Sequence, residues 1–103
     1  MSLRVVLLSG ADADLQEVFN RFEDYRDGFG IEFMTVIDAY LARIAAFPEI
    51  APTYFESVRR QVILKFPYGI FYEPQPTRIL VTAILDLRQD ERQILRRLRR
   101  SNA

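Results

Sequence analysis

Residues 58–73 read Val-Arg-Arg-Gln-Val-Ile-Leu-Lys-Phe-Pro-Tyr-Gly-Ile-Phe-Tyr-Glu. The basic pair Arg59 and Arg60 opens an alternating stretch that predicts a strand over residues 58–65. The segment Phe66-Pro67-Tyr68 then turns into a second, aromatic strand. Cationic and aromatic side chains on adjacent strands form a surface suited to phosphates and stacked bases, or to an acidic groove of a partner protein.

More strands are predicted on both sides of this pair. Residues 3–9 are an apolar run of strand length, which predicts a strand buried on both faces. A turn at residues 74–77 suits a hairpin and leads into a last strand over residues 79–86. Alternation in residues 58–65 separates an apolar face from a polar one, with Arg60 as the exception on the apolar face. The apolar face comprises Val58, Val62 and Leu64.

Two helices are predicted between the first strand and residue 58. An apolar stripe at helical spacing runs from Leu15 to Tyr25, after capping candidates at Ser9, Gly10 and Asp12. Asp27-Gly28 breaks this helix, and the second runs from about residue 30 to residue 47, where Pro48 stops it. Because the connection is short, the two helices are expected to form an antiparallel hairpin.

The tail, residues 89–100, is predicted to be a basic helix. It carries three apolar residues on one side and five arginines elsewhere, which predicts loose docking onto the body. The order β-α-α-β-β-β-α over residues 1–103 predicts a single α+β domain, an antiparallel β-sheet packed on an N-terminal helical hairpin. The other face of the sheet is then expected to be free to carry function.

The composition excludes several classes of site. Among its 103 residues the chain has neither cysteine nor histidine. Disulfides, thiolate metal sites and histidine-dependent nucleophilic or metal sites are therefore ruled out, and no metal or other cofactor is predicted. Proton transfer would fall to carboxylates, Tyr, Lys or Arg with shifted pKa values. With neither a run of membrane-span length nor a signal peptide, the sequence predicts a cytoplasmic protein with no membrane partner.

Charge is unevenly distributed along the chain. Residues 1–52 carry nine acidic and four basic side chains, whereas residues 53–103 carry five acidic and ten basic ones. This asymmetry indicates a basic working surface and an acidic helical side. The carboxylates of the first helix lack metal-ligand spacing and are interpreted as solvating charge.

The hairpin of residues 58–73 supplies the first candidate site residues. Arg59, Arg60 and Lys65 suit phosphate binding, although a solvated basic strand is the favoured interpretation from the residues alone. Tyr68 and Tyr72 suit base stacking, although strand aromatics most often belong to the core. Of the aromatic residues, Tyr68 is the best candidate for an exposed face.

A second candidate is Asp86-Leu87-Arg88, where the last strand meets the tail helix, because strand ends lie at the rim of a sheet. Helix capping explains Asp90. No such local role explains Arg88. The tail arginines, Arg92 among them, suit nucleic acid or an acidic partner, although a charge run is more often a solvated face.

Several of these motifs occur together, in order, across nearly the whole chain. They are Ala11 with Asp14-Leu15, Phe47-Pro48, Arg59-Arg60, Leu64, Phe66-Pro67-Tyr68, Ile70, Tyr72, the apolar strand 79–85 and Arg88. In this order and spacing they resemble the RelE/ParE family of bacterial toxins, and the Phe-Pro-Tyr segment is the most specific part. The resemblance implies the toxin of a type II toxin–antitoxin, or plasmid stabilisation, module.

The resemblance is closer to ParE-like members, which inhibit DNA gyrase by binding it. Position 86, often histidine in the family, is aspartate here, and no aromatic residue follows Tyr72. The neutral net charge also argues against binding deep in the ribosome. The resemblance further implies a hetero-oligomer with a cognate antitoxin that wraps the apolar helix–sheet surface. The candidate partner-binding residues are Arg59, Arg60, Lys65, Tyr68, Arg88 and Arg92.

Two alternatives stay open at this point. One is a RelE-like ribosome-dependent mRNA endonuclease, in which Lys65 or Arg88 stabilises the scissile phosphate and Tyr68 or Tyr72 stacks a base, with Arg59 completing the set. The chain offers no evident acid–base pair for that reaction, so the sequence favours binding over enzymatic activity. The other alternative is a non-toxic family member that retains antitoxin binding.

Overall fold

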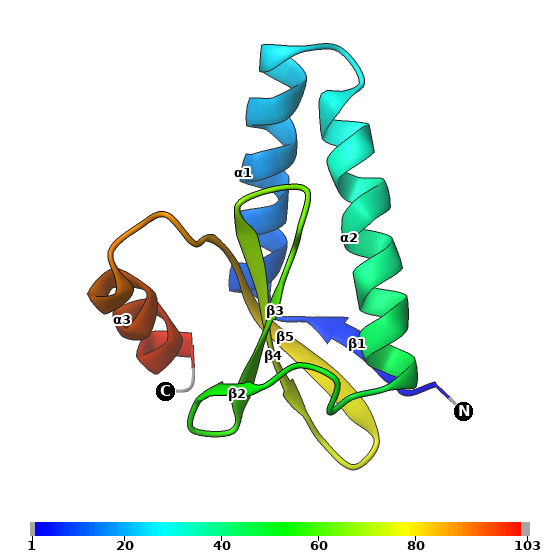
Figure 1. The fold of residues 1–103 in the computed structure, drawn as a ribbon, viewed down its shortest axis with the longest axis vertical. Helices are drawn as coiled ribbons and strands as arrows, with labels where there is room; N and C mark the ends of the chain where they lie inside the picture. The colour runs from blue at the N-terminus through cyan, green and yellow to red at the C-terminus, as the bar shows by residue number, and fades with distance from the viewer. Residues whose placement is uncertain (1, 102–103) are drawn as a thin grey trace.

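The computed structural model describes residues 2–101 of the chain. It confirms the predicted α+β class, with a sheet between a helical hairpin and a tail helix (Figure 1). One short strand, β2, joins the predicted order. In chain order the elements are β1 (Arg4–Leu7), α1 (Ser9–Tyr25), α2 (Phe29–Ala46), β2 (Thr53–Phe55), β3 (Val58–Val62), β4 (Tyr68–Pro74), β5 (Arg78–Asp86) and α3 (Glu91–Ser101).

The sheet has the strand order β1-β5-β4-β3-β2. Strands β2 to β5 are antiparallel neighbours, as predicted, whereas β1 runs parallel to β5. The prediction that the first strand is buried on both faces is wrong, because β1 is an edge strand whose residues are exposed or half-buried. An apolar run indicates that a strand lies near the core, but it does not show which elements lie beside the strand. The pattern alone therefore overestimated the burial of β1.

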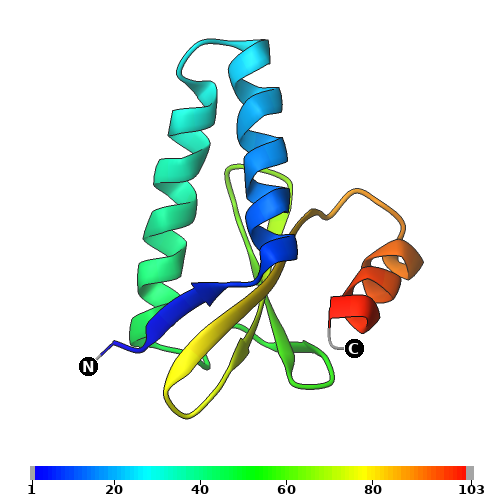
Figure 2. The same ribbon diagram turned by 180° about the vertical axis from the view of Figure 1, so that it is seen from behind.

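The helical hairpin covers one face of the sheet (Figures 1 and 2). Gly28, in the turn between the helices, has φ of 85°, a left-handed conformation that glycine adopts without steric cost. No side chain caps the first turn of α1, so the capping expectation for Ser9, Gly10 and Asp12 is wrong. The main core cluster includes Phe33, Ile37 and Ile44 of α2 with Ile70, Tyr72 and Val81 of the sheet.

The tail helix α3 covers the opposite face, which the sequence analysis expected to be free. Ile94 and Leu98 are buried there in a second core cluster with Val58, Phe71 and Ala83. Complete burial of an aliphatic side chain of this size stabilises a fold by roughly 1.5–3 kcal/mol. The docking is therefore firm, and the expectation of loose docking is wrong, because the sheet presents an apolar surface that matches the helix stripe.

Strand β3 ends at Val62, three residues before the predicted end at Lys65. The loop that follows turns Ile63 into the main cluster, while Leu64 is left 89% exposed and Val62 39% exposed. The predicted apolar face is thus correct for Val58 alone. Alternation along the strand indicates which residues share a face but not which of them the second cluster covers, and Val58 is the residue of β3 in that cluster.

Candidate functional site

A polar hollow of about 410 Å³ lies between α1 and the end of β5. It brings together two predicted site residues, Tyr68 and Arg88, with two further polar residues, Arg21 and Asp86. The remaining lining residues are Asp14, Glu17, Val18, Phe22, Ile84, Leu85 and Gln89.

Tyr68 is a core residue with a polar tip. Its ring is 2% exposed and meets the rings of Phe22 and Phe33 edge-on. The Tyr68 hydroxyl reaches the hollow, where it accepts a hydrogen bond from the Arg21 guanidinium. The expectation of an exposed stacking surface is wrong, because residues 68, 70 and 72 all face the helical hairpin. Burial raises the pKa of the Tyr68 hydroxyl above its usual value, so the group is a neutral donor at physiological pH.

Arg21 was not identified from the sequence. It follows Asp14 and Glu17 on the face of α1 that lines the hollow, at the i, i+3 and i+7 positions of a helix. Its guanidinium lies 3.8 Å from the Glu17 carboxylate. Helical spacing indicates that these residues share a face, but nothing local in the sequence shows that Tyr68 lies opposite them.

Asp86 and Arg88 form a closed local pair at the mouth of the hollow. The Asp86 carboxylate accepts the Arg88 backbone N–H at 2.8 Å, Nε at 3.1 Å and Nη2 at 2.7 Å. These contacts lower the pKa of Asp86 and raise that of Arg88. Arg88 therefore does have a local explanation, contrary to the sequence analysis. The sheet register places Asp86 directly opposite Tyr68.

The other predicted basic residues lie apart from this hollow and from one another. Arg59 donates to the backbone carbonyl of Ala51 at 2.7 Å and so holds the loop before β2. Arg60 lies on the opposite sheet face, 4.7 Å from the ring centroid of Tyr54. Arg59 and Arg60 therefore lie on opposite faces of the sheet, as strand alternation predicted, and they share no basic surface.

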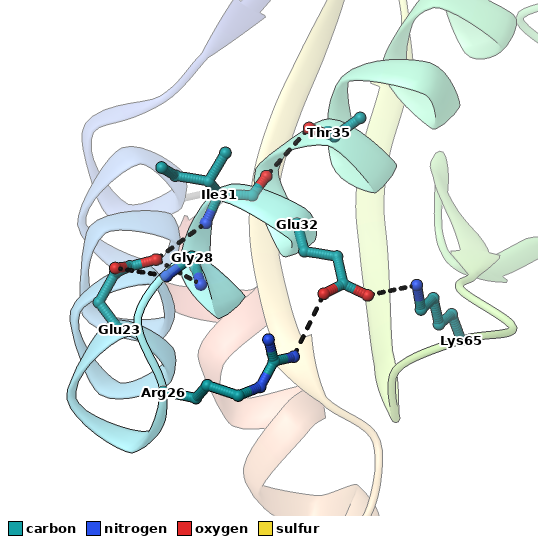
Figure 3. A network of polar contacts seen from close by, with 8 residues as sticks. Glu23, Arg26, Gly28, Ile31, Glu32, Thr35 and Lys65 are labelled. Carbon is teal, nitrogen blue, oxygen red and sulfur yellow. Dashed lines mark hydrogen bonds and ion pairs between the residues drawn. The ribbon is translucent and has the colours of Figure 1, made fainter.

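Lys65 belongs to a polar network at the tip of the helical hairpin formed by α1 and α2 (Figure 3). Its ammonium group lies 2.5 Å from the Glu32 carboxylate, which also pairs with Arg26 at 3.3 Å. Next to these ion pairs, the Glu23 carboxylate accepts hydrogen bonds from the backbone N–H groups of Gly28, Gly30 and Ile31 at the start of α2. The network joins the two helices to the loop after β3.

Arg92 lies on the tail helix and is 86% exposed. It pairs with Asp90, whose carboxylate also accepts the Arg92 backbone N–H at 2.7 Å. This contact confirms the predicted capping role of Asp90.

Two carboxylates of α1 are structural, which corrects their interpretation as solvating charge. One is Glu23, described above. The other is Asp14, which accepts the Ile84 backbone N–H at 3.0 Å and two hydrogen bonds from Arg97 of α3 at 2.8 Å each. Ile84 lies beyond the last β1–β5 pair, so Asp14 takes an N–H that strand pairing leaves available. The Asp14–Arg97 clasp joins α1, β5 and α3, and only tertiary packing reveals it.

The electrostatics of the hollow suit binding rather than proton transfer. The pKa of Asp86 is lowered, and those of Tyr68 and Arg88 are raised, so each of these groups titrates further from neutrality than it ordinarily would. General acid–base catalysis works best with a group whose pKa lies near the operating pH. The guanidinium groups of Arg21 and Arg88 and the phenol of Tyr68 are hydrogen-bond donors that line one small hollow.

Comparisons with known proteins place the fold. No protein-family model matches the sequence, and no curated protein matches it. Twelve chains of solved structures do match. One of them is described as "Chromosomal ParDE TA system from P. aeruginosa", with a TM-score of 0.74 and 12% sequence identity over 84% of this chain and 97% of that one. Within residues 2–101, no helix is both long and apolar enough to cross a membrane. This chain has a ParE/RelE-like toxin fold, as the order of its motifs predicted.

Proposed function

We propose that this chain is the toxin of a type II toxin–antitoxin module, and that it acts in the cytoplasm as a ParE-like inhibitor of DNA gyrase. In this proposal it works by protein binding and is neutralised by a cognate antitoxin in a hetero-oligomer. Two independent observations support it: the order of motifs around Phe66-Pro67-Tyr68, and the fold likeness to a chain of the chromosomal ParDE system.

The choice of binding over RNA cleavage rests on the polar hollow. A ribonuclease has to activate a ribose 2′-hydroxyl and protonate the leaving oxygen. The chain has no histidine, and Tyr68, Asp86 and Arg88 have pKa values displaced away from neutrality. These observations favour binding over cleavage, while the fold likeness to a chain of the ParDE system carries the proposal of a toxin.

The surface offers places for both protein partners. Between α1 and α2, a shallow groove with Leu15, Phe19 and Met34 on its walls suits an antitoxin segment wrapped over the helices. Lys65, Arg88 and Arg92 each expose more than half of their side chains, and these three are the proposed contacts with an acidic target. Arg59, Arg60 and the buried ring of Tyr68 are better explained by their contacts within the chain, whereas the Tyr68 hydroxyl lines the polar hollow.

The test is to induce the chain in growing bacteria without an antitoxin while following labelled thymidine and methionine incorporation in parallel. We expect DNA synthesis to fail first, and purified chain to inhibit supercoiling by purified gyrase. Protein synthesis failing first would favour the ribosome-dependent endonuclease. Unchanged growth with soluble, folded protein would contradict toxicity itself and favour the non-toxic alternative.

The endonuclease alternative has one observation in its favour, which is that Arg21, Tyr68 and Arg88 surround a single hollow. A chain in which Arg59, Lys65 and Arg88 are all replaced by alanine tests it, with cleavage of ribosome-bound mRNA as the readout. Cleavage by the original chain that disappears in this folded variant would support the endonuclease. Absence of cleavage by the original chain would exclude it.

A further inference from the structure

We propose that the polar hollow binds a Glu or Asp side chain of a protein partner, which competes with Asp86 for the Arg88 guanidinium. The inference goes beyond the proposed function by naming the ligand chemistry and the residue that competes with it. It depends on that function only for the statement that the carboxylate comes from a protein.

The donors of the hollow come from three separate parts of the chain. Arg21 projects from α1, Tyr68 begins β4, and Arg88 follows β5. The Tyr68 hydroxyl accepts a hydrogen bond from Arg21, and within residues 2–101 no acceptor takes its own hydrogen. That hydrogen is therefore available to an acceptor that enters the hollow.

Asp86 is one of the carboxylates that line the hollow. It lies opposite Tyr68 in the sheet register, and Arg21 contributes to the lowering of its pKa after the larger effect of Arg88. Among residues 2–101, the Arg88 guanidinium hydrogen-bonds to this carboxylate alone, and its side chain is 72% exposed, so a competing carboxylate has access to it from solvent.

A second turn of the chain makes the same local contacts outside the hollow, and it serves as a comparison for Asp86. Asp90 grips Arg92 through the same three groups, the backbone N–H, Nε and Nη2, and in the same i, i+2 relation. That turn caps α3 and lies outside the hollow. The local motif is thus common to both turns, and only Asp86 adds a second arginine and a phenol to its surroundings.

The charges around the hollow favour a carboxylate over a nucleic-acid phosphate. Its lining carries Arg21 and Arg88 against the three carboxylates Asp14, Glu17 and Asp86. Such a lining does not attract a polyanion. A single carboxylate brings one negative charge, where a polyanion brings many, and it matches the planar fork of an arginine.

The experiment uses the full chain and acetate as the probe, with the side-chain Nε–H resonances of Arg21 and Arg88 as the readout. Asp86→Asn keeps an oxygen for the Arg88 backbone N–H but removes the competing charge. We expect the variant to bind acetate about tenfold more tightly than the original chain, with both resonances shifting together. In this background, Tyr68→Phe is expected to weaken acetate binding severalfold, because one donor is lost.

Asp90→Asn is the matched control, and it is expected to leave the Arg21 and Arg88 response to acetate as it is in the original chain. The inference is overturned if folded Asp86→Asn, checked by circular dichroism, shows no gain in acetate binding. An equal gain in acetate affinity at Arg21 and Arg88 in Asp90→Asn would overturn the inference as well. The gain would then not depend on removing the charge of Asp86.

The source of the carboxylate is tested with two further probes on Asp86→Asn, a short peptide with one glutamate as its only acidic side chain and a ten-nucleotide single-stranded RNA. We expect the peptide to displace acetate at a lower concentration than the RNA does. Preference for the RNA would overturn the assignment to a protein partner. A chain that binds acetate as expected but leaves DNA synthesis intact would contradict the proposed function and not this inference.

Discussion

The two faces of the sheet are held in different ways. The hairpin face buries a large cluster with four aromatic side chains, Phe33, Phe66, Tyr68 and Tyr72. Within residues 2–101, the cluster on the tail face contains five buried residues, and a pair of hydrogen bonds from Arg97 to Asp14 joins its helix to α1. The difference indicates that the hairpin face depends mainly on its larger apolar area, whereas the short tail helix depends more on a directional polar contact.

Truncating the centre of the hairpin face should have the largest effect. Phe33 is fully buried and contacts the rings of Phe22, Phe66 and Tyr68. We expect Phe33→Ala to lower the free energy of unfolding by about 4 kcal/mol, because it removes apolar contacts and leaves a cavity. Urea unfolding followed by circular dichroism measures the loss. A loss below about 1 kcal/mol would contradict the assignment of this face as the main core.

Truncating the tail face should cost less and act more locally. Leu98→Ala removes the most deeply buried side chain of α3, and we expect a loss of about 2–3 kcal/mol in the free energy of unfolding. Hydrogen exchange should show lost protection concentrated in α3, with the hairpin little affected. Equal loss of protection on both faces would show instead that the two clusters unfold as one unit.

Weakening the clasp should have a smaller effect again. Asp14 and Arg97 have side chains that are 15% and 21% exposed, so their pairing is only partly screened by solvent. We expect Asp14→Asn to lower the free energy of unfolding by about 1–2 kcal/mol, since the amide keeps an acceptor for the Ile84 N–H but loses the charge. Asp12→Asn, an exposed change in the same helix, is the control and should stay within about 0.5 kcal/mol.

The smallest expected effect is a dependence on pH at the hairpin tip. The backbone N–H of Gly28 is the main group that lowers the pKa of Glu23 below its usual 4.5, and Lys65 is the main group that lowers that of Glu32. A lowered folded-state pKa stabilises the fold fully above the unfolded value of 4.5 and loses that contribution as pH falls through the folded value. The urea concentration at the midpoint of unfolding of the original chain should therefore decrease as the pH drops below about 4.5.

Glu23→Gln should show a shallower decline over the same pH range, because one titrating carboxylate has been removed. The measurement is the urea midpoint of both chains between about pH 3 and pH 7. An unchanged slope in the variant would show that Glu23 does not contribute to the acid sensitivity of the hairpin.

Local patterns were sufficient for some features whose partners are close in sequence. The apolar stripe and Gly28 identified the helical hairpin, and Asp90 was identified as a cap because it bonds to residues one turn away. The same reasoning failed at Asp86, where strand-end position suggested an unpaired Arg88 although the two side chains lie two positions apart. A local pair of this kind needs the backbone conformation after β5, which residue types do not specify.

The candidate site depended on contacts that no local pattern contains. Arg21 and Tyr68 are separated by 47 positions, and Asp14 and Arg97 by 83. From the residues alone, the α+β class, the hairpin, the toxin-like order of motifs and the lack of a histidine were already clear. Which arginines share a surface, which helices cover each face of the sheet and how deeply Tyr68 is buried were settled only by packing. Alternation and helical spacing place side chains on faces, whereas the neighbours of each face depend on how the whole chain folds.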